Sequence, residues 1–124
     1  MQGARTGSHS YSILQGKSKR CYFTDTETGP LERHHIYFGV GMRQISDKHG
    51  FWVWLKPEWH RGTSGVHGRD GHKIDLRLKQ DCQRKFEETH TRAEFMAIIG
   101  RNYLGDEPEG KPQMPADTGG FYLL

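Results

Sequence analysis

Four of the eight histidines in this 124-residue chain have a spacing that could build a reactive site. His34 and His35 are adjacent in a run typical of a strand, and His60 and His67 follow a second such run. Neutral imidazoles bind divalent transition metals well, and three of them leave a coordination position open. Because neighbouring residues on a strand point to opposite faces, one shared site requires a strongly bent hairpin. Such a hairpin would give one imidazole to a metal and the other to a bound phosphate.

Two short β-prone stretches are expected to position the histidine pair. Residues 31–38 (LERHHIYF) and 51–55 (FWVWL) combine aromatic and β-branched side chains, which favours strands. Glycines bracket the connection between them, and residues 43–48 predict a turn of helix within it. Tyr22-Phe23 is a candidate for a further short strand.

Three helices are expected after the second strand. Proline at the first turn predicts a short helix over 57–61. Apolar residues at every fourth position predict a helix over about 74–89 with one buried stripe. A capping box over Thr91–Glu94 predicts a helix over about 92–100. The residues of the buried stripe are Ile74, Leu78, Cys82 and Phe86.

The composition predicts one small, loop-rich α+β domain. Apolar residues make up 33% of the chain, mean hydropathy is −0.86, and 16 glycines and 5 prolines are present. We expect residues 21–104 to form the domain, after a flexible segment over 1–20. Residues 105–124, which are acidic and rich in proline and glycine, predict a disordered tail. Residues 1–10 contain Gly-Ser-His, which is typical of vector-encoded sequence.

Charge and cysteine usage limit the class of protein. No apolar run approaches the roughly 20 residues that span a bilayer, and no secretory signal is expected. Two cysteines far apart predict a reducing compartment, and we expect a cytoplasmic protein. The formal net charge of +3 is compatible with a polyanionic partner such as DNA.

The segments LERHHI, VWLKPEWH and GVHG, in this order, resemble the HNH branch of the His-Me finger endonucleases. The resemblance runs over about residues 21–104 and is greatest to small HNH-like proteins of phages and prophages. It implies a ββα-metal core, treble-clef-like, with additional C-terminal helices. It also implies one divalent metal ion as cofactor, with Zn, Mg, Mn and Ni all candidates.

The resemblance also implies roles for the four histidines. In relatives with two adjacent histidines on the first strand, the first binds the metal and the second is the general base. These roles correspond to His34 and His35. The histidine that ends the following short helix is a metal ligand, which corresponds to His60. His67 corresponds to the last ligand, although seven residues separate it from His60, and His72 is its competitor.

The chain departs from the family pattern where the orienting asparagine is expected. Residues 48–51 read Lys-His-Gly-Phe, so His49 or a backbone carbonyl would have to orient the general base. Glu32 is a candidate for orienting a metal-bound histidine from behind. Arg33, Arg61 and Arg69 are candidates for binding the phosphate. The Cys-x-x-Cys knuckle of many relatives is absent, because Thr24 follows Cys21 at that spacing.

The expected function is metal-dependent hydrolysis of DNA phosphodiester bonds, by nicking or cutting, in phage DNA metabolism. A neutral histidine can accept the proton of an attacking water at neutral pH. The alternative is a catalytically inactive HNH-fold module that binds DNA or a phage or host protein, since the asparagine and the knuckle are missing. The retained histidine set favours the enzyme.

Overall fold

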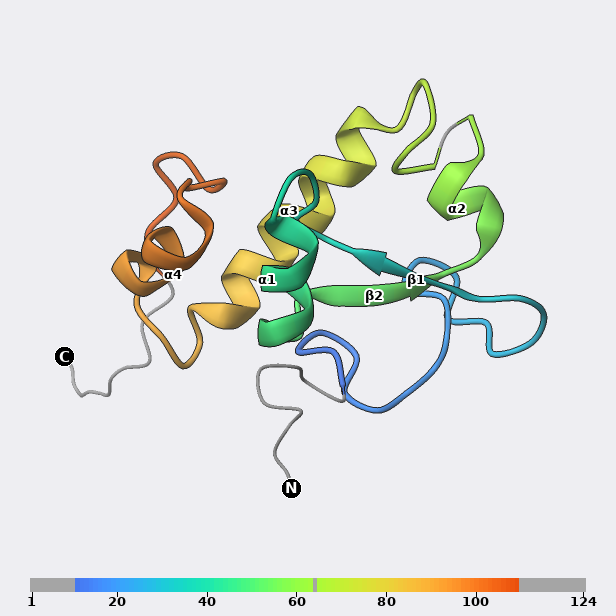
Figure 1. Ribbon diagram of the computed structural model, residues 1–124, viewed down its shortest axis with the longest axis horizontal. Helices are drawn as coiled ribbons and strands as arrows, with labels where there is room; N and C mark the ends of the chain where they lie inside the picture. Colours follow the sequence, from blue (N-terminus) through green and yellow to red (C-terminus); the bar gives the residue numbers. More distant parts are fainter. Residues whose placement is uncertain (1–10, 64, 110–124) are drawn as a thin grey trace, which may run out of the picture.

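The computed structural model describes residues 11–63 and 65–109, which form a two-stranded antiparallel sheet and four helices. Figure 1 shows their arrangement. Strands and helices share one small unit, which confirms the α+β class. In chain order the elements are β1 (Glu32–His35), α1 (Met42–His49), β2 (Trp52–Leu55), α2 (Pro57–Arg61), α3 (His72–Phe86) and α4 (Arg92–Ile99).

The hairpin of β1 and β2 has one buried face and one that is partly open. His34 lies opposite Val53, and His35 lies opposite Trp52. Because side chains alternate along a strand, His34 and Val53 share one face and His35 and Trp52 share the other. His34 and Val53 are fully buried. β1 ends earlier than the predicted run over 31–38, because the chain turns toward α1 after His35.

Helix α1 is inserted between the two paired strands. It is flanked by Gly41 and Gly50, whose φ angles of 77° and 75° are in the left-handed region that glycine adopts freely. The buried Ser46 hydroxyl donates to the Tyr37 carbonyl at 2.7 Å and accepts from the Tyr37 amide at 3.1 Å. These bonds tie α1 to the end of β1. With eight residues, α1 is longer than the single turn predicted over 43–48.

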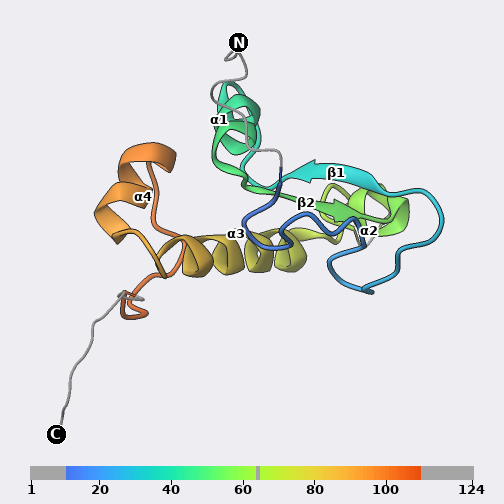
Figure 2. The same ribbon diagram turned by 90° about the horizontal axis from the view of Figure 1, so that it is seen from below.

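The core lies between the hairpin and the C-terminal helices. Figure 2 shows α1 and α3 on opposite sides of the hairpin, with α4 beyond one end and α2 at the other. Tyr37, Phe51 and Phe95 are fully buried, and the ring of Tyr37 contacts the other two rings edge-on. Leu78 and Cys82 of α3 pack against this aromatic cluster.

The helix predictions agree closely with the structure. α2 has the predicted bounds, and α3 spans 72–86 where 74–89 was expected. Leu78, Cys82 and Phe86 are buried as predicted, whereas Ile74 is only partly buried. The capping box of α4 is confirmed, with the Glu94 amide 3.0 Å from the Thr91 hydroxyl and the Thr91 amide 2.7 Å from the Glu94 carboxylate.

Residues 11–30 pack along the edge of β2 that β1 leaves open. The Tyr22 amide donates to the Trp54 carbonyl at 2.9 Å, and the Ile13 amide donates to the Gly50 carbonyl at 2.9 Å. Tyr22-Phe23 forms a turn rather than the predicted strand, because the loop closes on itself between Cys21 and Thr26. Residues 11–20, assigned from sequence to a flexible segment, are thus part of the fold. Residues 1–10 lie outside the described residues.

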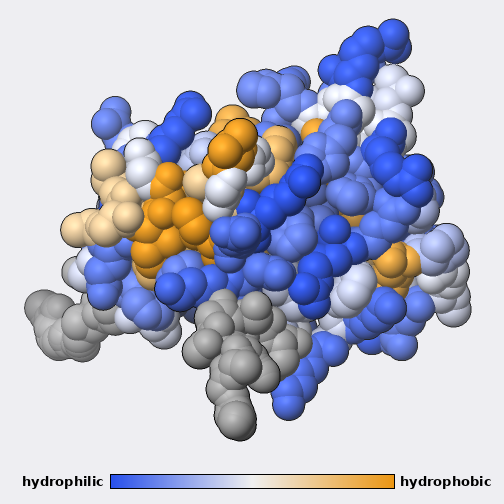
Figure 3. Space-filling model, viewed as in Figure 1, coloured by the Kyte–Doolittle hydropathy of each residue, from blue (hydrophilic) through white to orange (hydrophobic). Residues whose placement is uncertain are grey.

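The chain after α4 begins by packing on the two C-terminal helices. The Glu107 carboxylate accepts two bonds from Arg84, and the Glu109 carboxylate accepts from the Arg92 amide. The rest of the predicted tail, 110–124, lies outside the described residues. Figure 3 shows apolar side chains gathered over α4 and the adjoining part of α1, whereas hydrophilic ones cover the hairpin and α2. Within the described ranges, no helix combines the length and apolar character needed to cross a membrane.

Candidate metal centre

Three histidines from separate parts of the chain converge on the buried face of the hairpin. His34 belongs to β1, His60 to α2, and His67 to the loop before α3. One ring nitrogen of each lies within 4.8 Å of those of the other two, and the ring centroids are 5.0–5.2 Å apart. The structure thus brings the three predicted ligands together as a group that could hold a metal ion.

The donor set fits a transition metal. Nitrogens bound to one ion at about 2.1 Å lie at most about 4.2 Å apart, so side-chain shifts of under about 1 Å would complete the site. Both ring nitrogens of His34 are buried and have no hydrogen-bond partner among the residues that the structure describes. Leaving such a group unsatisfied costs about 1–3 kcal/mol, which a metal–nitrogen bond would relieve.

The surroundings of the cluster favour the neutral form of two of its imidazoles, His34 and His67. Burial, together with the nearby His67 and His60, lowers the pKa of His34 to about 2. Burial and the charge of His60 lower the pKa of His67 as well. Metals bind the unprotonated imidazole, so this environment favours ligation at any physiological pH.

The metal-free protein is expected to lose stability as the pH falls below about 6.5. The unfolded chain binds a proton at His34 with a pKa near 6.5, whereas the folded chain does so only near pH 2. Unfolding therefore takes up a proton in this interval, at about 1.4 kcal/mol per pH unit. Urea denaturation in EDTA at pH 7, 6 and 5 would measure the slope. His34→Gln should flatten it, and an unchanged slope would contradict the assignment.

A carboxylate orients His60 from behind. Glu32 Oε1 lies 2.8 Å from His60 Nδ1 and also accepts from Arg61 Nε at 2.9 Å. The bonds from Arg61 and His60 lower the pKa of Glu32 to about 2, so the group is an acceptor only. His60 Nδ1 therefore carries the hydrogen, and Nε2 keeps the lone pair that a metal needs. Glu32 thus has the position predicted for it.

Glu32→Gln is expected to weaken metal binding by about 10–100-fold, the usual effect of losing the partner behind a metal-bound histidine. The amide can present its NH₂ group to His60 Nδ1, which disturbs the tautomer that leaves Nε2 free. Titration with Zn²⁺ or Ni²⁺ in a calorimeter would measure the change. Glu58→Gln, an exposed position on the same helix, is the matched control. Equal metal affinity in the two variants would show that Glu32 does not support the metal site.

The loop after α2 explains the wide spacing of the last ligand. Its backbone folds back on α2, so that the His67 amide donates to the His60 carbonyl at 2.9 Å. This fold requires glycine, because a Cβ atom on Gly68 would lie 1.8 Å from the carbonyl oxygen of Gly62. His72, the competing candidate, is exposed at the first turn of α3 and lies outside the cluster.

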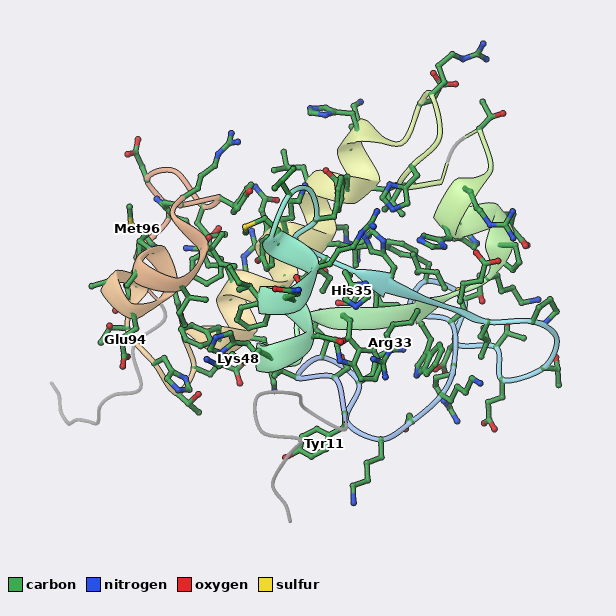
Figure 4. The ribbon with its side chains drawn as sticks, in the orientation of Figure 1. Tyr11, Arg33, His35, Lys48, Glu94 and Met96 are labelled. Atoms are coloured by element: carbon green, nitrogen blue, oxygen red, sulfur yellow. The ribbon has the colours of Figure 1, made fainter. Side chains whose placement is uncertain are left out.

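His35 faces the other side of β1 and pairs with a carboxylate of α1. His35 Nε2 lies 3.1 Å from Asp47 Oδ1, and Arg33 Nη1 donates to the same oxygen at 3.1 Å. Figure 4 shows Arg33 and His35 beside α1, on the same side of the hairpin. Because a carboxylate only accepts, Nε2 carries the hydrogen and Nδ1 keeps its lone pair. His35 is therefore oriented as a proton acceptor.

His49 does not hold the orienting position expected for it. Its ring stacks on Phe51 at 5.4 Å and lines a different cavity with Phe86 and His90. Successive residues on a helix are rotated by about 100°, so positions 47 and 49 point in different directions. The orienting partner of His35 is Asp47.

A cavity of about 320 Å³ is lined by His35 and by two of the three clustered histidines, His60 and His67. Two of its lining residues, Arg33 and Arg43, are cations that can face a phosphate. The Phe38 ring forms an apolar wall 4.8 Å from the ring of His67. The lining residues are Arg33, His35, Phe38, Arg43, His60 and His67.

The two other predicted phosphate-binding arginines lie away from this cavity lining. Arg61 is engaged by Glu32, and its side chain is largely exposed. Arg69 is 82% exposed and lies 3.8 Å from the Asp70 carboxylate. Arg43 lines the cavity instead, although the sequence did not single it out among the other cations of the chain that could contact a phosphate.

Comparisons of the chain with protein-family models, with curated proteins and with solved structures found no match. The HNH relationship therefore stays a prediction from the sequence motifs.

Proposed function

We propose that this protein is a metal-dependent endonuclease that hydrolyses DNA phosphodiester bonds, with an HNH-type ββα-metal core made of β1, β2 and α2. The observation that carries the proposal is the connection, through one cavity, of a three-histidine cluster with a carboxylate-oriented histidine. A metal site alone would suit many functions. A metal site beside a positioned base and two arginines suits hydrolysis of an anionic ester.

The chain's own residues supply the proton transfer and the charge. His35, held by Asp47, accepts a proton from the attacking water as its oxygen bonds to phosphorus. Breaking the opposite P–O bond releases the leaving oxygen, which takes a proton from solvent. Arg33 and Arg43 line the cavity where the extra negative charge of the phosphate would develop.

His34, His60 and His67 would hold the metal ion, which when bound supplies Lewis-acid stabilisation of the phosphate and leaving oxygens. An all-imidazole donor set suits Zn²⁺ and Ni²⁺ better than Mg²⁺, which prefers oxygen ligands. Mn²⁺ is also compatible with imidazole, so the assays below include all four ions.

Nicking of supercoiled plasmid tests the proposal. The protein is first stripped with EDTA and then supplied with Mg²⁺, Mn²⁺, Ni²⁺ or Zn²⁺ at up to millimolar concentration. We expect relaxed circles with at least one ion, none in EDTA, and an undiminished rate for His72→Ala as a histidine control. DNA binding without cleavage by any ion would overturn the enzyme and leave the inactive binding module.

Asp47→Asn is expected to lower the nicking rate by about tenfold. A hydrogen bond to a charged group contributes about 1.5–3 kcal/mol, and the partly exposed Asp47 belongs at the low end of that range. The amide keeps the size of the side chain but has no charge, and it can present its NH₂ group to His35 Nε2, which disturbs the tautomer that leaves Nδ1 free. Initial rates would measure the change, with Asp70→Asn as an exposed control. A rate equal to that of the wild type would show that Asp47 does not orient the base.

A further inference from the structure

A second groove lies beside the metal centre, with Arg33 between the two. It has a volume of about 440 Å³ and is formed by the open face of the hairpin and the segment over 16–19. Because Arg33 lines both hollows, an extended ligand that passes Arg33 from the metal centre enters this groove. We call it the Trp54 groove. Its lining residues are Gly16, Lys17, Lys19, Arg33, Trp52 and Trp54.

The walls of the Trp54 groove are fixed by hydrogen bonds. Ser12 and Gly16 exchange two backbone bonds of 3.1 and 2.8 Å, which close a tight turn just before the two lysines. The Gln15 side chain accepts from the Trp54 amide at 2.8 Å and so ties this turn to β2. These bonds fix the backbone of the turn relative to β2 and so set the two sides of the groove.

Cations and aromatic rings line the Trp54 groove, and the described residues on its walls include no carboxylate. Lys19 Nζ lies 4.6 Å above the Trp54 ring, and the Arg33 guanidinium lies 3.9 Å from the Trp52 ring. Trp52 is only 2% exposed and forms the floor, whereas Trp54 is partly exposed. Lysines beside a partly exposed ring suit a nucleotide, with its phosphates on the cations and its base stacked on the ring once Lys19 has moved off it.

We infer that the Trp54 groove binds an unpaired stretch of the DNA strand whose scissile phosphate lies in the metal centre, an inference that rests on the proposed function. A base can stack on Trp54 only if its own face is free, which excludes a base within an intact duplex. Lys19, which now covers the ring, would move to a phosphate. The substrate class is thus DNA with a single-stranded segment next to the cleavage position.

Binding in EDTA tests this inference without any dependence on cleavage. Fluorescence anisotropy would compare a labelled oligothymidylate of about 12 nucleotides with a blunt duplex of the same length. We expect tighter binding of the single strand. Trp54→Ala should weaken it by about tenfold, and Trp54→Phe, which keeps an aromatic ring and the fold, should restore most of the affinity.

The lysines are tested by the salt dependence of binding. Lys17→Ala/Lys19→Ala should lower the slope of log affinity against log salt by about 1.4, because each single-strand phosphate contact contributes about 0.7. Lys48→Ala/Lys73→Ala removes the same charge from exposed positions outside the groove and should leave the slope unchanged.

The two proposals fail in distinguishable ways. Equal affinity for duplex and single strand, or no effect of Trp54→Ala, would overturn the groove assignment even if the plasmid is nicked. Selective single-strand binding that depends on Trp54 and the two lysines would support the groove even if no metal ion gives cleavage. In that case only the proposal that the protein is an endonuclease would fail.

Discussion

His35→Ala is expected to lower the rate constant for phosphodiester hydrolysis by about 10²–10⁴-fold, the usual contribution of a positioned general base. His35 is the histidine of β1 that faces away from the metal cluster, and Asp47 holds its Nε2 so that Nδ1 is free to accept a proton. Without it, the attacking water must lose its proton to solvent. Single-turnover cleavage with the best metal ion would measure the rate.

Metal binding by the same variant distinguishes the loss of the general base from the loss of the metal site. His35 is not one of the three clustered ligands, so His35→Ala should bind Ni²⁺ or Zn²⁺ with the affinity of the wild type. His72→Ala should be unchanged in both assays. If His35→Ala and the wild type nick at equal rates, the cleavage comes from a contaminating nuclease and the assignment of the base fails.

The features that could be predicted from the sequence are those that depend on short-range patterns of residues. Pro57 and the capping box at Thr91 mark helix starts by short-range chemistry, and both helices begin where expected. The three clustered histidines follow from motif order and from the strand–strand–helix sequence. The paired strands and α2 bring His34 and His60 together, and the glycine-rich loop that folds back on α2 brings in His67.

The parts that sequence could not predict depend on contacts between distant segments. Asp47 orients His35 only because α1 is a full helix inserted into the hairpin, while residues 43–48 by themselves indicate little more than a turn. Residues 11–20 contain three cations, two serines and a glycine, which resembles a flexible segment, although Ile13 and Leu14 pack against the core. They are held to the fold by the bond from the Ile13 amide to the Gly50 carbonyl and by the Gln15 side chain, which composition does not reveal.

His34→Ala is expected to lower metal affinity by more than about 100-fold, beyond the effect of losing a residue behind a ligand. His34 is the most buried of the three clustered histidines, and neither of its ring nitrogens has a hydrogen-bond partner within the described ranges. Removing it leaves two donors and an empty space where the imidazole was. Calorimetric titration with Zn²⁺ and with Ni²⁺ would measure the loss.

Thermal unfolding gives the same prediction a second measurement. A metal ion at about 100 times its dissociation constant should stabilise the wild type by about 2.7 kcal/mol, and EDTA should remove this gain. His34→Ala should unfold at one temperature with and without metal, whereas His72→Ala should respond like the wild type. Because each variant is compared with itself, a general loss of stability from the cavity does not affect the result. Metal-induced stabilisation that persists in His34→Ala would show that the ion binds elsewhere. The nuclease proposal, which depends on a metal ion at the three clustered histidines, would then fail.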